Sequence, residues 1–162
     1  MLVALISDTH IPRRAQGLPE RCVERLRAAD LIIHAGDLIT SAVLTQLREY
    51  GDVAAVHGNA DDAEVQQALP CEIGIDLCGR QVVVVHDAGP RIGRLPRLRR
   101  RYPEADAVIF GHSHIPVHET DAHGFQIFNP GSPTDRRRAR NHTMGLVRPS
   151  GHGLAFELLA LD

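Results

Sequence analysis

Lysine and tryptophan are absent from the 162 residues, and aromatic residues make up only 4% of them. Leu, Val, Ile and Ala must therefore supply most of the core, and arginine carries the permanent positive charge. No apolar run approaches the roughly 18 residues that a membrane-spanning helix needs, so no membrane association is expected. With 43% hydrophobic and 23% charged residues, the composition excludes a disordered, collagen-like or disulfide-stapled chain.

Cysteine is also scarce. Cys22, Cys71 and Cys78 are odd in number and form no CxxC motif. We expect reduced, partly buried thiols in a cytoplasmic protein, with a Cys71–Cys78 bridge as the alternative. The apolar residues 1–6 lack a basic lead-in and run directly into Ser7-Asp8-Thr9-His10, which predicts a strand rather than a signal peptide.

The net charge of −2 argues against a general binder of polyanions. The charge is nevertheless uneven, with seven arginines against twelve acids in residues 1–81 and eleven against eight in residues 82–162. Two arginine clusters lie in the second half: Arg97, Arg99, Arg100 and Arg101, and then Arg136, Arg137, Arg138 and Arg140. Neither is interleaved with aromatics, so base stacking is not supported and long nucleic acid is not an expected partner.

Apolar runs alternate with helical patterns up to Gly111, and only strand patterns follow it. Helices are expected from Pro19, from a Thr40 or Ser41 cap to Gly51, and over residues 95–102. Strands are expected at residues 2–6, 31–34, 52–56, 81–85, 107–110, 125–128, 143–147 and 154–159. This order predicts a single α/β domain over residues 1–162, with two packed sheets and helices outside.

Polar residues that can carry chemistry follow these strands directly. They are Asp8 and His10, Asp37, His57 and Asn59, His86, and His112 and His114. Each fragment alone has a common structural explanation, such as a turn for Gly36-Asp37 or a buried core histidine for His86. Several strand ends that deliver Asp, His or Asn nevertheless predict a ligand site, because open α/β sheets bind ligands at the carboxyl ends of their strands.

The ordered motifs extend this interpretation. Asp8-x-His10, Gly36-Asp37, Gly58-Asn59-Ala60-Asp61, His86 and Gly111-His112-Ser113-His114 resemble those of the metallophosphoesterase (calcineurin-like) superfamily. The chain length and Asn129-Pro130-Gly131-Ser132 narrow the resemblance to the small YfcE-like phosphodiesterases. It spans Ser7 to Ser132 and implies a four-layer αββα sandwich of two mixed sheets flanked by helices.

The resemblance also implies a site for two metals. Asp8, His10, Asp37 and His114 would hold one ion, and Asp37, Asn59, His86 and His112 would hold the other, with Asp37 bridging. Imidazole and carboxylate ligands suit divalent transition metals, so we expect Mn foremost, with Fe, Zn, Co or Ni as alternatives.

The expected mechanism needs no serine or cysteine nucleophile. Two ions about 3.5–4 Å apart would lower the pKa of a shared water toward neutrality, and the resulting hydroxide would attack phosphorus in line while the ions stabilise the phosphoryl charge. Asp37, Asn59 and His112 would act through the metals. The neutral Asn59 oxygen leaves a positive excess that attracts phosphate.

Two positions depart from the family pattern. Ala60 stands where many relatives have the histidine expected to protonate the leaving group, which puts poorly activated substrates in doubt. His57 is a candidate substitute donor, although the favoured interpretation is a histidine in a place where relatives often have Arg or Lys. Ala88 replaces the second histidine of the family's His-Gly-His, and Asp87 either orients a ligand histidine or caps the turn before Gly89.

The remaining histidines receive structural roles. His34 is expected to form a hydrogen bond beneath the site, and Asp61 to support it or its turn. His118, His123, His142 and His152 are assigned to surface loops. The second arginine cluster directly follows Asn129-Pro130-Gly131-Ser132 and can steer a phosphorylated substrate to the site mouth.

The favoured function is a phosphodiesterase for small phosphodiesters or nucleotides. A non-catalytic scaffold is the alternative, since a retromer subunit resembles these enzymes yet works chiefly through protein contacts. A phosphomonoesterase is a further alternative, which Ala60 disfavours. Exposed sheet edges suggest a homodimer or homotetramer.

Overall fold

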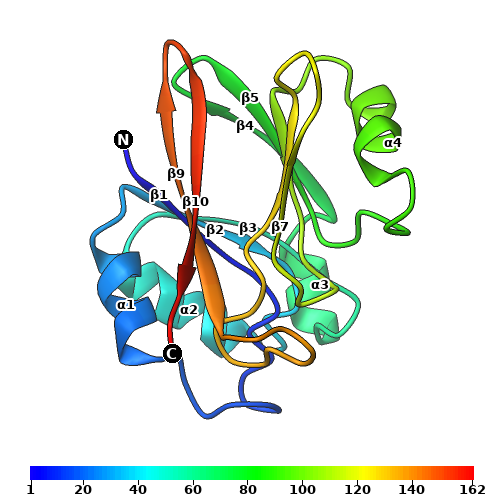
Figure 1. The fold of residues 1–162 in the computed structure, drawn as a ribbon. Coiled ribbons are helices and arrows are strands. Elements are labelled where there is room, and N and C mark those ends of the chain that lie inside the picture. The colour runs from blue at the N-terminus through cyan, green and yellow to red at the C-terminus, as the bar shows by residue number, and fades with distance from the viewer.

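The computed structural model describes residues 1–162. Two five-stranded sheets pack against each other, and helices cover their outer faces (Figure 1). This arrangement confirms the predicted four-layer sandwich.

The first sheet has the strand order β10-β9-β1-β2-β3. Strands β1 (Val3–Ile6), β2 (Leu31–Ala35) and β3 (Val53–Val56) are parallel. Strand β9 (Thr143–Ser150) is antiparallel to β1, and β10 (Gly153–Ala160) pairs antiparallel with β9 at the edge. The continuous apolar run of β1 is fully buried because both faces of the strand are covered. Ala4 and Ile6 pack in the cluster with the helices, and Val3 and Leu5 pack between the sheets.

The second sheet has the order β4-β5-β6-β8-β7. Strands β5 (Arg80–Val85), β6 (Ala107–Ile109) and β8 (Gln126–Asn129) are parallel. The antiparallel strands β4 (Glu72–Leu77) and β7 (Val117–Thr120) form the edges. Both sheets are therefore mixed, as predicted.

Four helices complete the layers. Helices α1 (Glu20–Arg27), α2 (Ser41–Tyr50) and α3 (Ala63–Ala68) bury Leu26, Leu47 and Val65 in one cluster with the outer face of the first sheet. Helix α4 (Arg94–Arg101) packs Leu98 against the second sheet. A third cluster, including Leu5, Ile33, Val84 and Phe128, fills the space between the sheets.

Some sequence expectations were wrong or incomplete. The expected elements do not include β4, β7 or α3. The alternating residues of β4 are typical of an edge strand, so this signal was present but overlooked. Three of the four residues of β7 are exposed and α3 has only 6 residues, so their signals are weak. Thr40 occupies the N-cap position of α2, but its side chain makes no capping hydrogen bond.

The cysteines are all free, so the alternative Cys71–Cys78 bridge is not formed. Only Cys22 is buried, whereas Cys71 and Cys78 are exposed. None of the helices combines the length and apolar character required to cross a membrane.

Candidate metal centre

The polar residues that follow the parallel strands of both sheets meet at one end of the sandwich. Asp8 and His10 follow β1, Asp37 follows β2, and Asn59 follows β3. From the second sheet, His86 directly follows β5, and His112 and His114 follow β6. The carboxyl ends of five strands thus contribute to a single cluster, which is where α/β sheets bind ligands.

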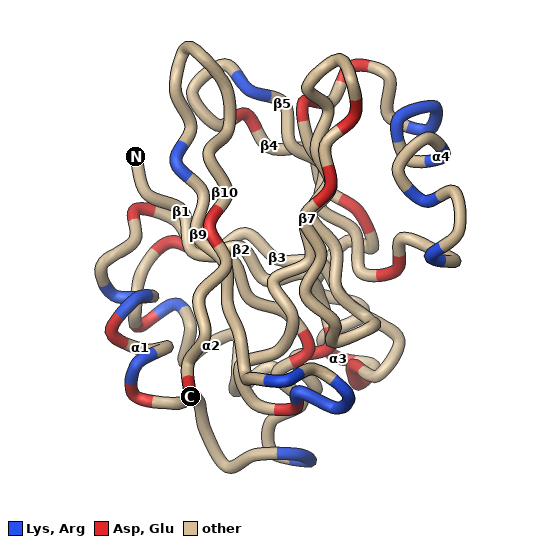
Figure 2. The backbone as a smooth tube through the Cα atoms, in the orientation of Figure 1, with Lys and Arg blue, Asp and Glu red and all other residues tan.

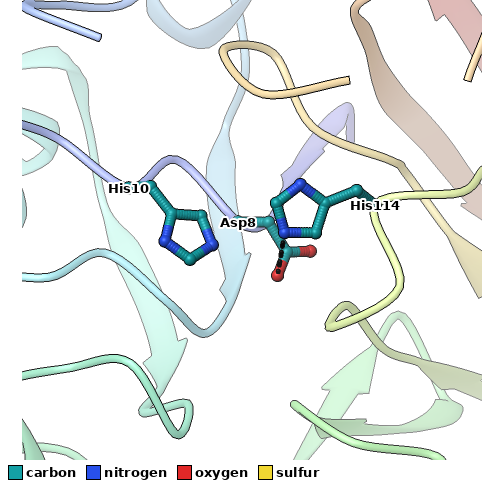
Figure 3. Close-up of side chains that lie close together, drawn as sticks. All are labelled: Asp8, His10 and His114. Carbon is teal, nitrogen blue, oxygen red and sulfur yellow. Dashed lines mark ion pairs between the residues drawn. The ribbon is translucent and has the colours of Figure 1, made fainter. Parts of the chain in front are cut away.

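The first group of donors consists of Asp8, His10 and His114, whose ligand atoms lie within 4.8 Å of one another (Figure 3). The Nδ1 atom of His114 donates to the Asp135 carbonyl, which leaves Nε2 as the unprotonated nitrogen of the neutral ring. That Nε2 lies 3.6 Å from Asp8 Oδ1. The buried Nε2 atoms of His10 and His114 have no hydrogen-bond partner. Because buried polar atoms are rarely left unpaired, two such lone pairs beside a carboxylate fit a bound cation.

The second group surrounds Asn59. Its Oδ1 lies 3.1 Å from His86 Nε2 and 3.0 Å from His112 Nδ1. His86 Nε2 is in turn 3.3 Å from Asp37 Oδ2. These donors are again imidazole, carboxylate and amide oxygen, a set that suits a divalent transition metal.

Asp37 lies between the two groups. Its Oδ2 atom is 3.4 Å from His10 Nε2 in the first group and 3.3 Å from His86 Nε2 in the second. Its Oδ1 atom accepts a hydrogen bond from the Ala60 backbone N–H at 2.8 Å, which fixes the carboxylate plane. All seven predicted ligand residues are thus brought together.

The ionisation of the cluster reflects its burial. Burial raises the pKa of Asp8 to about 7, although the charge of His86 opposes this shift. Burial also acts to raise the pKa of Asp37, but the hydrogen bond and charge of His86 outweigh it and hold the value at about 2. Burial lowers the pKa of both His10 and His114, so these rings stay neutral near pH 7 and keep their lone pairs. Burial also acts to lower the pKa of His86, but the hydrogen bond of Asp37 and the charges of Asp8 and Asp37 outweigh it and raise the value to about 9. Neutral imidazoles and ionised carboxylates are the forms that bind metals, so His10 and His114 are already in this form, whereas His86 must release a proton to bind an ion.

Five of the seven residues have a left-handed backbone. The φ angles are +54° at Asp8, +46° at His10, +62° at Asp37, +67° at His112 and +59° at His114. Such conformations cost a non-glycine residue about 1–2 kcal/mol each. This backbone turns the side chains of the five residues toward the same point at the strand ends. Backbone strain that is concentrated in this way is typical of a functional site.

Two glycines allow the segments to approach closely. A Cβ atom at Gly58 would overlap the carboxylate of Asp37, and one at Gly111 would lie 2.8 Å from Asp8 Oδ2. The glycines in Gly58-Asn59 and Gly111-His112 therefore leave room for ligand residues of other strands.

Asp61 connects two ligand segments. Its carboxylate accepts hydrogen bonds from the backbone N–H groups of Asp37 at 3.1 Å, Ile39 at 2.6 Å and Gly58 at 2.6 Å. The side chain is buried, and its supporting role agrees with the expectation. Asp61 thereby fixes the backbone next to the candidate ligands Asp37 and Asn59, although it is not itself one of the seven candidate ligands.

His34 has the predicted structural role. Its Nδ1 accepts a hydrogen bond from the Gly36 N–H at 3.2 Å, so Nε2 carries the proton and donates to Thr9 Oγ1 at 3.1 Å. Burial lowers its pKa to about 3, which keeps the ring neutral. Of the two roles considered for Asp87, the structure supports capping of the turn, because its carboxylate accepts a hydrogen bond from the Gly89 N–H at 2.8 Å.

His57 does not join the cluster. Its Nδ1 lies 3.3 Å from the carbonyl of Gly58, and its ring shares the wall of a cavity of about 250 Å³ with His86 and Asp87. Of the histidines assigned to surface loops, His118 lies on β7 instead, where its ring packs against Phe128 and Phe156.

Sequence reasoning missed the contribution of the β8–β9 connection. Asn129 donates to the Gly111 carbonyl at 2.8 Å, and Ser132 donates to the Asp8 carbonyl at 2.7 Å. The Asp135 carbonyl orients His114. The Asn129-Pro130-Gly131-Ser132 motif could have indicated the roles of Asn129 and Ser132. Nothing in the sequence distinguishes Asp135.

Comparison with known proteins shows what this chain is similar to. The family model of the calcineurin-like phosphoesterase superfamily domain matches residues 1–151. A protein of Methanothermobacter thermautotrophicus described as a probable metallophosphoesterase is 36% identical, covering 98% of this chain and 92% of its own. Two solved structures share the fold. Zinc-complexed Vps29 of Entamoeba histolytica superposes with a TM-score of 0.78 at 22% identity, with all of both chains covered. An archaeal phosphodiesterase superposes with a TM-score of 0.73 at 19% identity, covering 98% of this chain and 100% of its own.

Proposed function

The chain belongs to the calcineurin-like phosphoesterase superfamily, and we propose that it is a phosphodiesterase that uses two metal ions to hydrolyse small phosphodiesters or nucleotides. The observation that carries this proposal is the position of Asp37 Oδ2, 3.4 Å from His10 Nε2 and 3.3 Å from His86 Nε2. One carboxylate oxygen faces both donor groups, as a bridging ligand requires.

The donors divide between the two ions. Asp8, His10, Asp37 and His114 would hold one, and Asp37, Asn59, His86 and His112 the other, with Mn²⁺ as the favoured metal. When bound, the ions supply an activated water nucleophile and stabilise charge on the phosphoryl oxygens. The chain's own contribution is a cluster with only two carboxylates, so the loaded site would keep a net positive charge that attracts phosphate. Five of the seven residues are buried, whereas Asn59 and His112 are exposed and leave the cluster open to a substrate.

Ala60 favours diesters over monoesters. This position offers a methyl group instead of an imidazole, so the leaving group receives no proton from it. The same fold supports phosphodiesterase activity in the archaeal neighbour.

The competing function is a protein-binding scaffold, as the Vps29 neighbours suggest. Such a role does not require metal donors. The two buried unpaired imidazole nitrogens, on His10 and His114, are explained by metal binding. Because a Vps29 neighbour is itself complexed with zinc, hydrolysis and not metal binding distinguishes the two functions.

A direct assay tests the proposal. Chelator-stripped protein is offered bis(p-nitrophenyl) phosphate and p-nitrophenyl phosphate, with and without Mn²⁺. We expect hydrolysis of the diester only with metal, and faster than that of the monoester. Turnover without metal, or none with Mn, Fe, Zn, Co or Ni, would contradict the proposal. Equal rates on the two esters would remove the preference for diesters.

His57 is proposed as the proton donor to poorly activated leaving groups, since it lines the same cavity as His86. For His57→Gln we expect a loss of about 100-fold on a diester with an alkyl leaving group and little change on a nitrophenyl diester, which needs no proton. The ratio of kcat/KM on the two substrates is the measurement. His123→Gln, on the exposed β7–β8 turn, is the matched control. Equal losses on both substrates would argue against this role.

A further inference from the structure

The β8–β9 loop borders the site on the side of His114. Its first residues are fixed to the loop that carries Asp8 and His10, since Ser132 Oγ donates to the Asp8 carbonyl at 2.7 Å and Thr134 Oγ1 to the Thr9 carbonyl at 2.6 Å. The next stretch, residues 135–140, contains four arginines and one aspartate. These arginines are therefore held at the edge of the metal centre.

Asp135 gathers two guanidinium groups beside His114. Its Oδ2 atom lies 3.8 Å from Arg137 Nε, 3.9 Å from Arg14 Nε and 3.7 Å from His114 Nδ1. Arg14 belongs to the β1–α1 loop, where its N–H donates to the His10 carbonyl at 2.8 Å. Basic stretches of both loops lie at the same lower end of the molecule (Figure 2). A single carboxylate oxygen thus separates each guanidinium from a candidate ligand ring.

One carboxylate cannot neutralise two guanidinium groups. The side chains of Arg14 and Arg137 are 67% and 49% exposed, so both remain accessible to an anion from solvent.

The arginines of α4 differ in this respect. Arg97 donates to the carbonyls of Ala88 at 2.9 Å and Pro90 at 2.7 Å, and Arg99 lies over the Phe125 ring. Arg101 pairs with Glu72 at 2.9 Å. These groups already have partners within the chain, whereas Arg14 and Arg137 share one.

We propose that Arg14 and Arg137 bind a second phosphate of the substrate, so that the preferred phosphodiester carries a terminal phosphate besides the one that is cleaved. This inference rests on the proposed phosphodiesterase function. The planar guanidinium presents paired N–H donors that match phosphate oxygens, and two of them beside the metal centre suit a dianionic group. A short 5′-phosphorylated nucleotide diester has this chemistry.

The test compares thymidylyl-(3′→5′)-thymidine with and without a 5′-phosphate on the Mn²⁺-loaded protein. We expect KM for the phosphorylated dinucleotide to be about tenfold lower, since two exposed ion pairs contribute modestly each. The difference shrinks in 0.5 M salt, a concentration at which the Debye length is below about 5 Å. Arg137→Gln and Arg14→Gln each reduce the difference, and the double variant removes it.

Arg148→Gln is the charge-matched control, because Arg148 lies on β9 and pairs with Glu157 at 3.2 Å. It should retain the full difference in KM. A second readout is calorimetric binding of thymidine 3′,5′-bisphosphate and thymidine 5′-monophosphate to the same proteins. The bisphosphate should bind more tightly to the wild type and to Arg148→Gln, but not to the Arg14 and Arg137 double variant.

The outcomes distinguish failure of the second-phosphate site from failure of the proposed phosphodiesterase function. Hydrolysis of both dinucleotides with equal KM would overturn the second-phosphate site while leaving the phosphodiesterase intact. No hydrolysis of any diester would contradict the phosphodiesterase, and the calorimetric comparison would then decide on the phosphate site alone. A preference that persists in the double variant would also overturn the assignment.

Discussion

Asp37→Asn is expected to lower the metal-dependent kcat on an aryl phosphodiester by about a thousandfold, which corresponds to the loss of several kcal/mol of charge stabilisation. The substitution removes the charge of the one carboxylate that faces both His10 and His86. An amide oxygen retains the shape and can still accept from the Ala60 N–H, so the fold should persist. Bound metal should fall from about two ions per chain to one or fewer.

Kinetics and metal analysis of the same preparation check this prediction. Asp87→Asn is the matched control, because Asp87 adjoins His86 but is exposed and bonds only the Gly89 N–H. It should retain both ions and the activity. A folded Asp37→Asn variant with two ions and full turnover would refute the bridging role.

Asp61→Ala is expected to have the largest effect on stability. The substitution deprives three backbone N–H groups, those of Asp37, Ile39 and Gly58, of their acceptor. An unpaired buried polar group costs about 1–3 kcal/mol, so the free energy of unfolding should fall by about 3–5 kcal/mol. This corresponds to a decrease in Tm of about 10 °C for a chain of this size.

The neighbouring Asp62 provides the comparison. It caps α3 by accepting from the Val65 N–H at 3.0 Å, and Asp62→Ala should cost only about 1 kcal/mol. Urea unfolding of both variants measures the difference. Metal affinity should also fall by about 10–100-fold in Asp61→Ala, because the supporting hydrogen bonds orient two ligand segments. Equal stability losses in the two variants would show that Asp61 is an ordinary turn residue.

Local patterns were sufficient for most of the fold. The apolar runs before Asp8, Asp37 and His86 predict buried strands, because a strand covered on both faces must be apolar throughout. The ends of these apolar runs place the polar donors at strand ends, so the order of the motifs was enough to predict a metal site there. Edge strand β7 was missed because three of its four residues are exposed and show no apolar signal.

The supporting contacts could not be predicted in this way. Ser132 and Asp8 are 124 residues apart, and Thr134 reaches Thr9 over 125 residues. Hydrogen bonds between residues so far apart leave no periodic pattern in the sequence. The choice between the two roles of Asp87 likewise depended on which N–H lies near its carboxylate.

The sequence by itself determined the order of the polar motifs along the chain, the types of donor atoms and the absence of a histidine at Ala60. These are properties of residue identity and spacing. Only the tertiary structure decided how the donors converge. Left-handed backbone at Asp8, His10, Asp37, His112 and His114 turns them to one point, and the surrounding packing must stabilise this strain. The partners of the arginines were also decided by the tertiary structure. Arg97, Arg99 and Arg101 of α4 each contact a partner away from the candidate metal centre, whereas Arg14 and Arg137 share Asp135 beside it.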